Sequence, residues 1–360
     1  MNRNRMPSWA LLIPLAAAAL LGVALVMTVG VALAIVCLIA LMGAVFASVH
    51  HAEVVAHRVG EPFGTLVLSL AITTIEVALI VSLMLSNPAD TAALPRDTVF
   101  ATIMIICNGV VGLCLLVGGI RHREQAFHVE GANTGLATLI ALSALTLVLP
   151  AFTTSAPGLT YSPAQLTFAA IASLVLWSMF VFVQTIRHRD YFLPVNRPGD
   201  ADTHAAPPSN RLAAASFGML MVALVAVVGL AKVLSPRIEV AMAAAGAPKS
   251  AIGIAIALLV LLPETWAATR AAQANRLQTS LNLAFGSALA SIGLTIPAVA
   301  VASMLLGVPL ALGLDPKELV LLILSFVVAS ITLVSGRTHV MQGVVHLVIF
   351  AAFVFFALVP

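Results

Sequence analysis

Residues 66–84 read LVLSLAITTIEVALIVSLM, an apolar stretch that carries one carboxylate, Glu76, near its middle. An α-helix of this length, rising about 1.5 Å per residue, can cross a hydrocarbon layer about 30 Å thick. The whole chain has the same character: 61% of its residues are hydrophobic, 9% are charged, and the mean hydropathy is +1.11. Soluble globular domains do not reach these values. The composition therefore predicts a membrane protein that crosses the bilayer many times.

Apolar stretches long enough to span a membrane as helices recur along the chain. The alternating pattern of a β-barrel is absent, so we expect an all-α fold with about 11 transmembrane helices. The three cysteines lie inside apolar stretches and are interpreted as small packing residues. The predicted spans are 9–28, 30–50, 64–86, 98–120, 133–152, 163–186, 211–234, 249–270, 279–305, 317–335 and 339–359.

Positive charges indicate which side of the membrane each loop occupies, because short cytoplasmic loops are enriched in Lys and Arg. With the N-terminus in the cytoplasm, the inner side collects 12 of the 17 Lys and Arg residues and the outer side collects 5. Eleven spans then place the C-terminus outside. The basic residues MNRNR before the first span are also typical of a signal sequence, but we expect that span to be retained.

A related motif occurs in each half of the chain. Residues 53–64 read EVVAHRVGEPFG and residues 239–250 read EVAMAAAGAPKS, so both give Glu-Val, five residues and Gly-x-Pro. Each motif leads into a span with a central acid, Glu76 in the first half and Glu264 in the second. The halves are therefore interpreted as two copies of one unit.

The number of spans sets how the two copies are related. Each copy holds five spans after the first, an odd number, so the second copy is predicted to lie upside down relative to the first. Inverted repeats of this kind are typical of secondary transporters that work by alternating access. The predicted division is 1–28 for an extra N-terminal helix, 29–186 for the first repeat, 187–210 for a cytoplasmic linker and 211–360 for the second repeat.

The two central acids need stabilising partners inside the membrane. A carboxylate at the bilayer centre costs roughly 3 kcal/mol on the insertion scale, so two cost about 6 kcal/mol. No Lys or Arg lies deep in any predicted span, which leaves protons, metal cations and neighbouring oxygen groups as partners. We therefore predict that Glu76 and Glu264 form a cation site.

Oxygen groups accompany both acids. Ser69, Thr73 and Glu76 lie along one stripe of a helix, and Pro263 lacks the N–H that would otherwise occupy a backbone carbonyl one turn earlier. Two carboxylates with hydroxyl, amide and carbonyl oxygens suit a hard cation such as Ca²⁺. The further candidate ligands are Asn108, Asn282 and Ser287.

The same pair of acids also predicts exchange for protons. Two carboxylates held close together cannot both stay ionised at low cost when the site is empty, so protons should bind as the metal leaves. One side of the membrane would load a divalent cation and the other would load protons.

Two stretches resemble a known family. Residues 60–77, GEPFGTLVLSLAITTIEV, and residues 262–297, LPETWAATRAAQANRLQTSLNLAFGSALASIGLTIP, closely resemble the two α-repeats of bacterial ChaA-type calcium/proton antiporters in the cation/calcium exchanger superfamily. The resemblance extends from about residue 50 to the end. It implies ten core helices in two inverted repeats, Glu76 and Glu264 as the cation- and proton-binding acids, and a place in the bacterial cytoplasmic membrane. The usual GN-x-x-E signature is replaced here by TTIE and LLPE.

The substrate implied by this resemblance is Ca²⁺ exchanged for H⁺, and ChaA-type members are also associated with Na⁺ and K⁺ exchange. We therefore expect a Ca²⁺/H⁺ antiporter and keep a monovalent Na⁺ or K⁺/H⁺ antiporter at the same site as the alternative. The expected partners are inorganic cations and the lipid bilayer, with no nucleic acid and no resident cofactor.

A histidine-rich segment gives a third hypothesis, from a different class. His50, Glu53 and His57 share one helix face and are candidate zinc ligands, which would make the protein a zinc-dependent membrane enzyme. Such an enzyme would bind zinc and keep its activity after Glu264→Gln. The milder hypothesis is that His50, His51 and His57, with Glu53, sense cytosolic pH.

Overall fold

The computed structural model describes the chain apart from residues 1–5, 61–62, 87–90, 194–207, 245–247, 249 and 360. The side chains of residues 63–69, 86, 235, 239, 242–243, 250, 252 and 259 are also outside this description. Most of the predicted linker, part of both Gly-x-Pro motifs and the hydroxyl of Ser69 therefore lie outside the described part of the chain.

Helices occupy every stretch that the sequence predicts to span the membrane. Among the described residues, nine helices are long and apolar enough to cross a bilayer, so the all-α membrane fold is confirmed, while the exact number of spans and the inverted relation of the repeats stay predictions. The elements are α1 (Ser8–Val26), α2 (Val31–Val59), α3 (Phe63–Ser86), α4 (Leu94–Met104), η1 (Ile105–Val110), α5 (Val111–His122), β1 (Gln125–Ala126), α6 (Val129–Ser143), η2 (Ala144–Val148), η3 (Leu149–Ala151), α7 (Pro163–Phe182), η4 (Val183–Arg187), η5 (Arg189–Phe192), α8 (Asn210–Ala244), α9 (Ser250–Gln273), α10 (Leu277–Leu306), α11 (Pro316–Val334), β2 (Arg337–Thr338) and α12 (Val340–Leu358).

Two helices are longer than the sequence predicts. Helix α2 continues through the histidine-rich segment to Val59, and α8 continues past Pro236 to Ala244. In both cases polar residues follow the apolar stretch without interrupting the helix, because a helix needs no apolar residue to keep its backbone hydrogen bonds. The length of each apolar stretch therefore predicts the membrane-spanning part but underestimates the length of the whole helix.

The chain forms two compact units. Unit 1 contains residues 1–91 and 201–247, and unit 2 contains residues 92–200 and 248–360. Each unit takes helices from both halves of the sequence, so these units differ from the predicted repeats, which are defined by sequence similarity.

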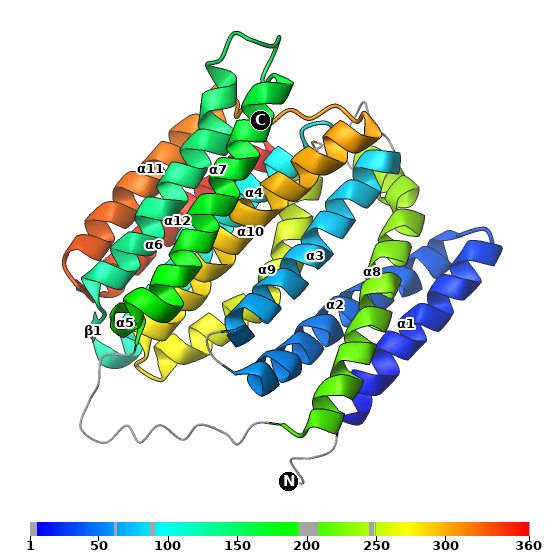
Figure 1. Cartoon of the computed structure of the whole chain (residues 1–360), viewed down its shortest axis with the longest axis horizontal. Helices are drawn as coiled ribbons and strands as arrows, with labels where there is room; N and C mark the ends of the chain where they lie inside the picture. The colour runs from blue at the N-terminus through cyan, green and yellow to red at the C-terminus, as the bar shows by residue number, and fades with distance from the viewer. Residues whose placement is uncertain are drawn as a thin grey trace. The chain divides into compact units, whose positions relative to one another are not determined.

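Unit 1 is built from α1, α2, α3 and α8, with α2 in contact with the other three (Figure 1). Ala52 of α2, Ala71 of α3 and Leu220 of α8 form a buried cluster in which the two residues of α2 and α3 are small. Side chains without bulk let helices approach closely, which is the usual way in which apolar helices associate in a membrane.

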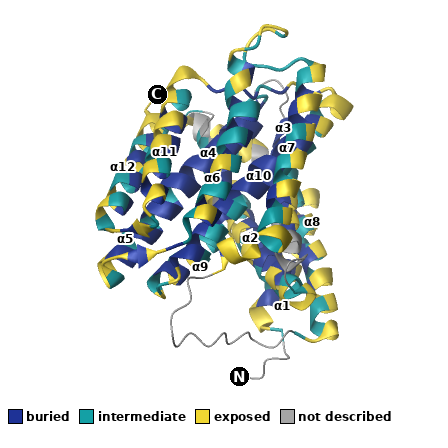
Figure 2. Cartoon of the chain, turned by 60° about the vertical axis from the view of Figure 1, so that its left-hand side comes forward, coloured by how far each residue is buried: buried dark blue, intermediate teal, exposed yellow. Residues whose placement is uncertain are grey.

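Unit 2 is organised around the continuous helical run α4–η1–α5. This run packs against α9, α10 and α12, and its residues are buried almost throughout. Figure 2 also shows many buried residues along α10. Helices α7, α11 and α12 instead carry many large exposed apolar side chains, among them Phe168, Ile331 and Phe355. Exposed side chains of this kind suit a lipid environment, so the run from Leu94 to His122 forms the core of the unit.

Glycines allow α5 and α12 to meet backbone to backbone. A side-chain carbon at Gly343 would lie 2.5 Å from the Leu116 nitrogen and 2.9 Å from the Gly112 oxygen. At Gly112 it would lie 2.9 Å from the Cβ of His346. Only glycine permits this approach, which brings the His346 side chain against the η1–α5 run.

A small sheet joins two interhelical connections in unit 2. Strand β1 pairs antiparallel with β2 through Gln125 and Thr338 and through Ala126 and Arg337. The sequence analysis did not predict these two short strands, because two residues are too few to give the alternating pattern by which a strand is recognised. The side chain of Gln125 also donates to the Ala272 carbonyl at 2.8 Å, which ties the sheet to the end of α9.

Candidate functional site

Glu76 lies within α3 of unit 1 and is 3% exposed. Thr73, one turn earlier on the same helix, is 6% exposed, so the two polar groups share a buried stripe. A buried carboxylate in an apolar helix is costly unless it binds a proton, a cation or polar groups. The burial that the prediction requires for Glu76 is therefore present.

Glu264 lies within α9 of unit 2 and is half-buried, with both carboxylate oxygens shielded from solvent. Pro263 directly precedes it inside the helix. Because proline has no N–H, it cannot donate the usual hydrogen bond to the backbone carbonyl one turn earlier in α9. Glu76 and Glu264 belong to different compact units, and their pairing in one site stays a prediction.

Asn108 lies at the same depth of unit 2 as Glu264. The run α4–α5 and helix α9 are parallel: a side-chain carbon at Gly253 would touch the Asp97 backbone at 2.9 Å, and His122 donates to the Gln273 carbonyl at 2.9 Å. Asn108 and Glu264 each lie eleven residues beyond the first of these contacts. Since each residue rises about 1.5 Å, their depths agree within about one helical turn.

The amide of Asn108 is fully buried and bonded to two other helices. Its nitrogen donates to the Ser325 hydroxyl of α11 at 2.8 Å, and its oxygen lies 3.3 Å from Nδ1 of His346 in α12. The sequence analysis missed His346. The available signal was a histidine seven residues inside the apolar span 339–359, because an ionisable residue within a membrane span is by default a candidate functional residue.

Asn282 and Ser287 lie on α10. The Asn282 nitrogen donates to the Phe192 carbonyl at 2.5 Å, and its oxygen accepts from Gln278 at 2.9 Å. These bonds fasten the segment after α7 to α10, so the Asn282 amide has a structural use. Ser287 is half-buried, and its role as a cation ligand stays a prediction.

His51 has a structural use in unit 1. Pro14 of α1 cannot donate to the Ala10 carbonyl, and Nε2 of His51 occupies that carbonyl at 2.8 Å. His50 packs on Trp9 with ring centroids 4.8 Å apart, whereas Glu53 and His57 are exposed. Among the residues that the structure describes, no group of three or more His, Cys, Asp or Glu could hold a metal ion.

Two outcomes separate pH sensing from this structural use. Replacing His50, His51 and His57 by Gln is expected to shift the pH profile of transport if these histidines sense pH, because glutamine does not ionise. The measurement is exchange in vesicles between pH 6 and 9, with a His50→Gln/His57→Gln variant that keeps the bond from His51 to Ala10 as the control. An unchanged pH profile would reject pH sensing. Lower thermal stability only in the variant that replaces His51 would support the structural role of His51.

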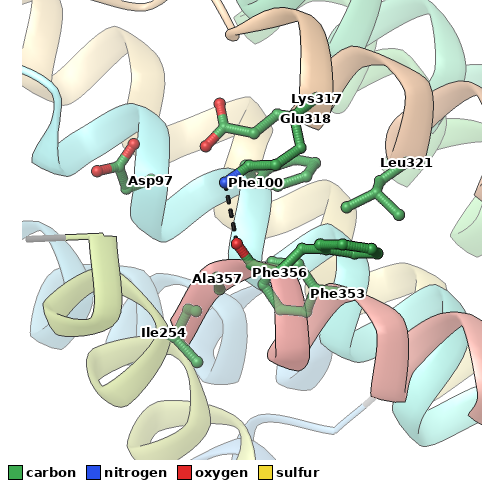
Figure 3. Close-up of a pocket in the computed structure, with 9 residues that line it drawn as sticks. All are labelled: Asp97, Phe100, Ile254, Lys317, Glu318, Leu321, Phe353, Phe356 and Ala357. Atoms are coloured by element: carbon green, nitrogen blue, oxygen red, sulfur yellow. Dashed lines mark hydrogen bonds between the residues drawn. The ribbon is translucent and has the colours of Figure 1, made fainter. Parts of the chain in front are cut away.

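A charged pocket lies at one end of unit 2, where α4 and α11 begin and α12 ends (Figure 3). Asp97 and Glu318 line it, and Lys317 donates to the Phe356 carbonyl at 2.9 Å. Arg96, 8% exposed, bonds Asp97 at 2.8 Å and lies 3.5 Å from Asp315. Arg96 therefore offsets the charge of these carboxylates and joins α4 to the start of α11, and the Lys317 bond joins α11 to the end of α12.

Comparison with known proteins assigns the chain to a family. The family model described as sodium/calcium exchanger protein matches residues 29–186 and 215–359. The chain is 50% identical over 320 residues, 89% of its length and 87% of the relative, to y4hA of Sinorhizobium fredii, which is named as a candidate ionic transporter. It is 34% identical over 325 residues, 90% of its length and 88% of the relative, to the sodium-potassium/proton antiporter ChaA of Escherichia coli.

A solved structure confirms the fold. The crystal structure of the H⁺/Ca²⁺ exchanger CAX matches with a TM-score of 0.72 at 13% identity, covering 97% of this chain and 89% of that one. Family and fold are those of membrane cation exchangers and not of enzymes, which excludes the zinc-dependent enzyme. The chain belongs to the sodium/calcium exchanger family of the cation/calcium exchanger superfamily and is a multi-pass membrane transporter similar to ChaA.

Proposed function

We propose that this protein exchanges Ca²⁺ for H⁺ across the bacterial cytoplasmic membrane, with Glu76 and Glu264 binding either the cation or protons. The observation on which the proposal depends is the burial of these two acids in otherwise apolar helices. A carboxylate in an apolar helix is costly unless a proton, a cation or polar groups offset its charge, so both acids are suited to binding a cation or protons.

The surrounding groups support a hard cation. Thr73 adds a hydroxyl near Glu76, Asn108 adds an amide at the depth of Glu264, and Pro263 lacks the N–H that would bond a backbone carbonyl one turn earlier in α9. Oxygen ligands with a total charge of −2 suit Ca²⁺, which accepts 6 to 8 oxygens in a tolerant geometry. When the cation leaves, the carboxylates take up protons, so cation and proton transport are coupled.

The direction of transport follows from the proton gradient, and the proposed topology gives both sides access to the site. Twelve Lys and Arg residues on one side and 5 on the other favour a cytoplasmic N-terminus and an outer C-terminus. Two inverted repeats would expose the acids alternately to the cytoplasm and to the outside. An inward proton gradient would then drive cation export.

A second candidate is Na⁺ or K⁺ exchange for H⁺ at the same site. The relative ChaA, at 34% identity, is named as a sodium-potassium/proton antiporter, and this observation favours the monovalent candidate. A monovalent ion leaves one of two carboxylate charges uncompensated unless one acid stays protonated. The two candidates therefore differ in how many protons each cation displaces.

Cation preference distinguishes the two candidates. In everted membrane vesicles with an established pH gradient, Ca²⁺ is expected to dissipate the gradient at a lower concentration than Na⁺ or K⁺, because two carboxylates attract a divalent ion more strongly. The pH gradient is followed with a fluorescent dye while each cation is added in turn. Dissipation by Na⁺ or K⁺ at lower concentrations than Ca²⁺ would establish the second candidate, and dissipation by none of them would reject both.

A further inference from the structure

A chain of buried polar side chains crosses the middle of unit 2. It contains Thr332 and Ser325 of α11, His346 of α12 and Asn108 of η1, none of which is more than 3% exposed. Thr332 Oγ1 lies 3.1 Å from Nε2 of His346, whose Nδ1 lies 3.3 Å from the Asn108 oxygen. Polar groups at this depth are costly unless they are satisfied, so their arrangement is strongly constrained.

The direction of every hydrogen bond among these four side chains follows from the Ser325 hydroxyl. The Ser325 hydroxyl donates to the Leu321 carbonyl at 2.7 Å, so its oxygen must accept from the Asn108 nitrogen. The amide oxygen of Asn108 therefore faces His346, and Nδ1 of His346 must carry a hydrogen. The neutral ring then has a bare Nε2, which accepts from the Thr332 hydroxyl.

The backbone is shaped to bring His346 to Asn108. Residues Ile105–Val110 form a π-helical turn, a local widening that often occurs at functional sites. The backbone of Cys107 in the same turn also bonds the ring of His346, so the ring N–H is shared between Cys107 and Asn108. On the next turn, Gly112 makes room for the Cβ of His346, as the 2.9 Å approach described above requires.

We propose that His346 is a positioning residue of the cation site: its Nδ1–H holds the amide oxygen of Asn108 in place at the depth of Glu264. The His346 N–H uses one lone pair of that oxygen, and the other lone pair stays available to a cation. Ser325 fixes the opposite end of the amide, so the amide cannot flip and present its nitrogen instead. This inference rests on the proposed function.

The alternative role of these four side chains is only to hold the helices together. Buried amides and hydroxyls join membrane helices in many proteins, and such bonds contribute on average about 0.6 kcal/mol. Adhesion alone predicts that loss of His346 lowers stability and leaves cation affinity unchanged in the folded protein. Positioning predicts that cation affinity changes as well, and only when Asn108 is present.

The experiment compares three substitutions of His346. Asparagine places an N–H where the imidazole has Nδ1, whereas glutamine places its amide where the imidazole has Nε2. His346→Asn is therefore expected to keep the half-maximal Ca²⁺ concentration for proton exchange near that of the wild type. His346→Gln and His346→Ala are expected to raise it about tenfold, the size of effect seen when the partner of a metal ligand is removed. Exchange is measured in everted vesicles that contain equal amounts of protein.

Two controls isolate the role of Asn108. Ile349→Ala, a buried change on the same helix, is expected to lower thermal stability without changing the half-maximal Ca²⁺ concentration. Asn108→Ala/His346→Ala is expected to match Asn108→Ala alone, because His346 acts through that amide. If His346→Ala fails to accumulate in the membrane, the comparison of the Asn and Gln variants still decides the question.

The outcomes separate this inference from the proposed function. Equal half-maximal concentrations for the wild type, His346→Gln and His346→Ala would overturn positioning while the antiporter stands. A rise of the same size in Ile349→Ala would also overturn it, because general packing would then explain the effect. Absence of cation-dependent exchange in the wild type, or full activity of Glu76→Gln and Glu264→Gln, would reject the proposed function and the inference with it.

Discussion

Glu264→Gln and Glu76→Gln, each made alone, are expected to abolish cation-dependent proton exchange. Glutamine keeps the size of the side chain but can neither carry the negative charge that attracts a cation nor release a proton near neutral pH. Each substitution therefore removes both halves of the exchange at once. We expect the loss to be at least 100-fold, on the order of the largest effects seen for the partners of metal ligands.

The measurement is dissipation of a pH gradient in everted vesicles on addition of Ca²⁺, Na⁺ or K⁺. The matched control is Glu130→Gln, the same chemical change at an exposed position in the first turn of α6, for which exchange should equal that of the wild type. Immunodetection of each variant in the membrane excludes a loss of protein. Activity retained by both site variants would falsify the shared-site mechanism, and loss in only one would limit the mechanism to that acid.

Gly343→Ala is expected to destabilise the protein by about 1–3 kcal/mol, although alanine favours a helix over glycine by about 1 kcal/mol. The added carbon at Gly343 would lie 2.5 Å from the Leu116 nitrogen and 2.9 Å from the Gly112 oxygen, and both are backbone atoms. A backbone cannot move aside as a flexible side chain can, so α5 and α12 must separate. The same movement would pull His346 away from Asn108.

An alanine substitution at Gly218 of α8 is expected to change the stability in the opposite direction. Gly218 is exposed, and a side-chain carbon there would have no neighbour within 4 Å. Gly218→Ala should therefore be neutral or stabilising by up to about 1 kcal/mol, since only helix propensity changes. Thermal unfolding in detergent measures both variants. Equal shifts of the melting temperature for Gly343→Ala and Gly218→Ala would show that the close contact between α5 and α12 is absent.

The candidate site was only partly predictable, and the histidines illustrate why. His50, His51 and His57 are close in sequence, which suggests a metal or pH site, yet His51 occupies the carbonyl that Pro14 leaves open, 41 residues away. His346 has a single polar residue one turn earlier in its helix, Gln342, and no acidic or cysteine neighbour that would indicate a site, yet it contacts Asn108 across 238 positions. Short spacing identified helix faces, whereas the partner of each side chain depended on packing between helices.

The sequence by itself determined the membrane-spanning helices and the two acids that interrupt them. A bilayer fixes the length of an apolar helix, and the cost of burying a charge makes each acid conspicuous, so both features can be recognised from local composition. The tertiary structure decided which helices form each compact unit and how Thr332, His346, Asn108 and Ser325 become one directional chain. Hydrogen-bond partners far apart in sequence are chosen by helix packing, and many different packings would satisfy the same apolar pattern.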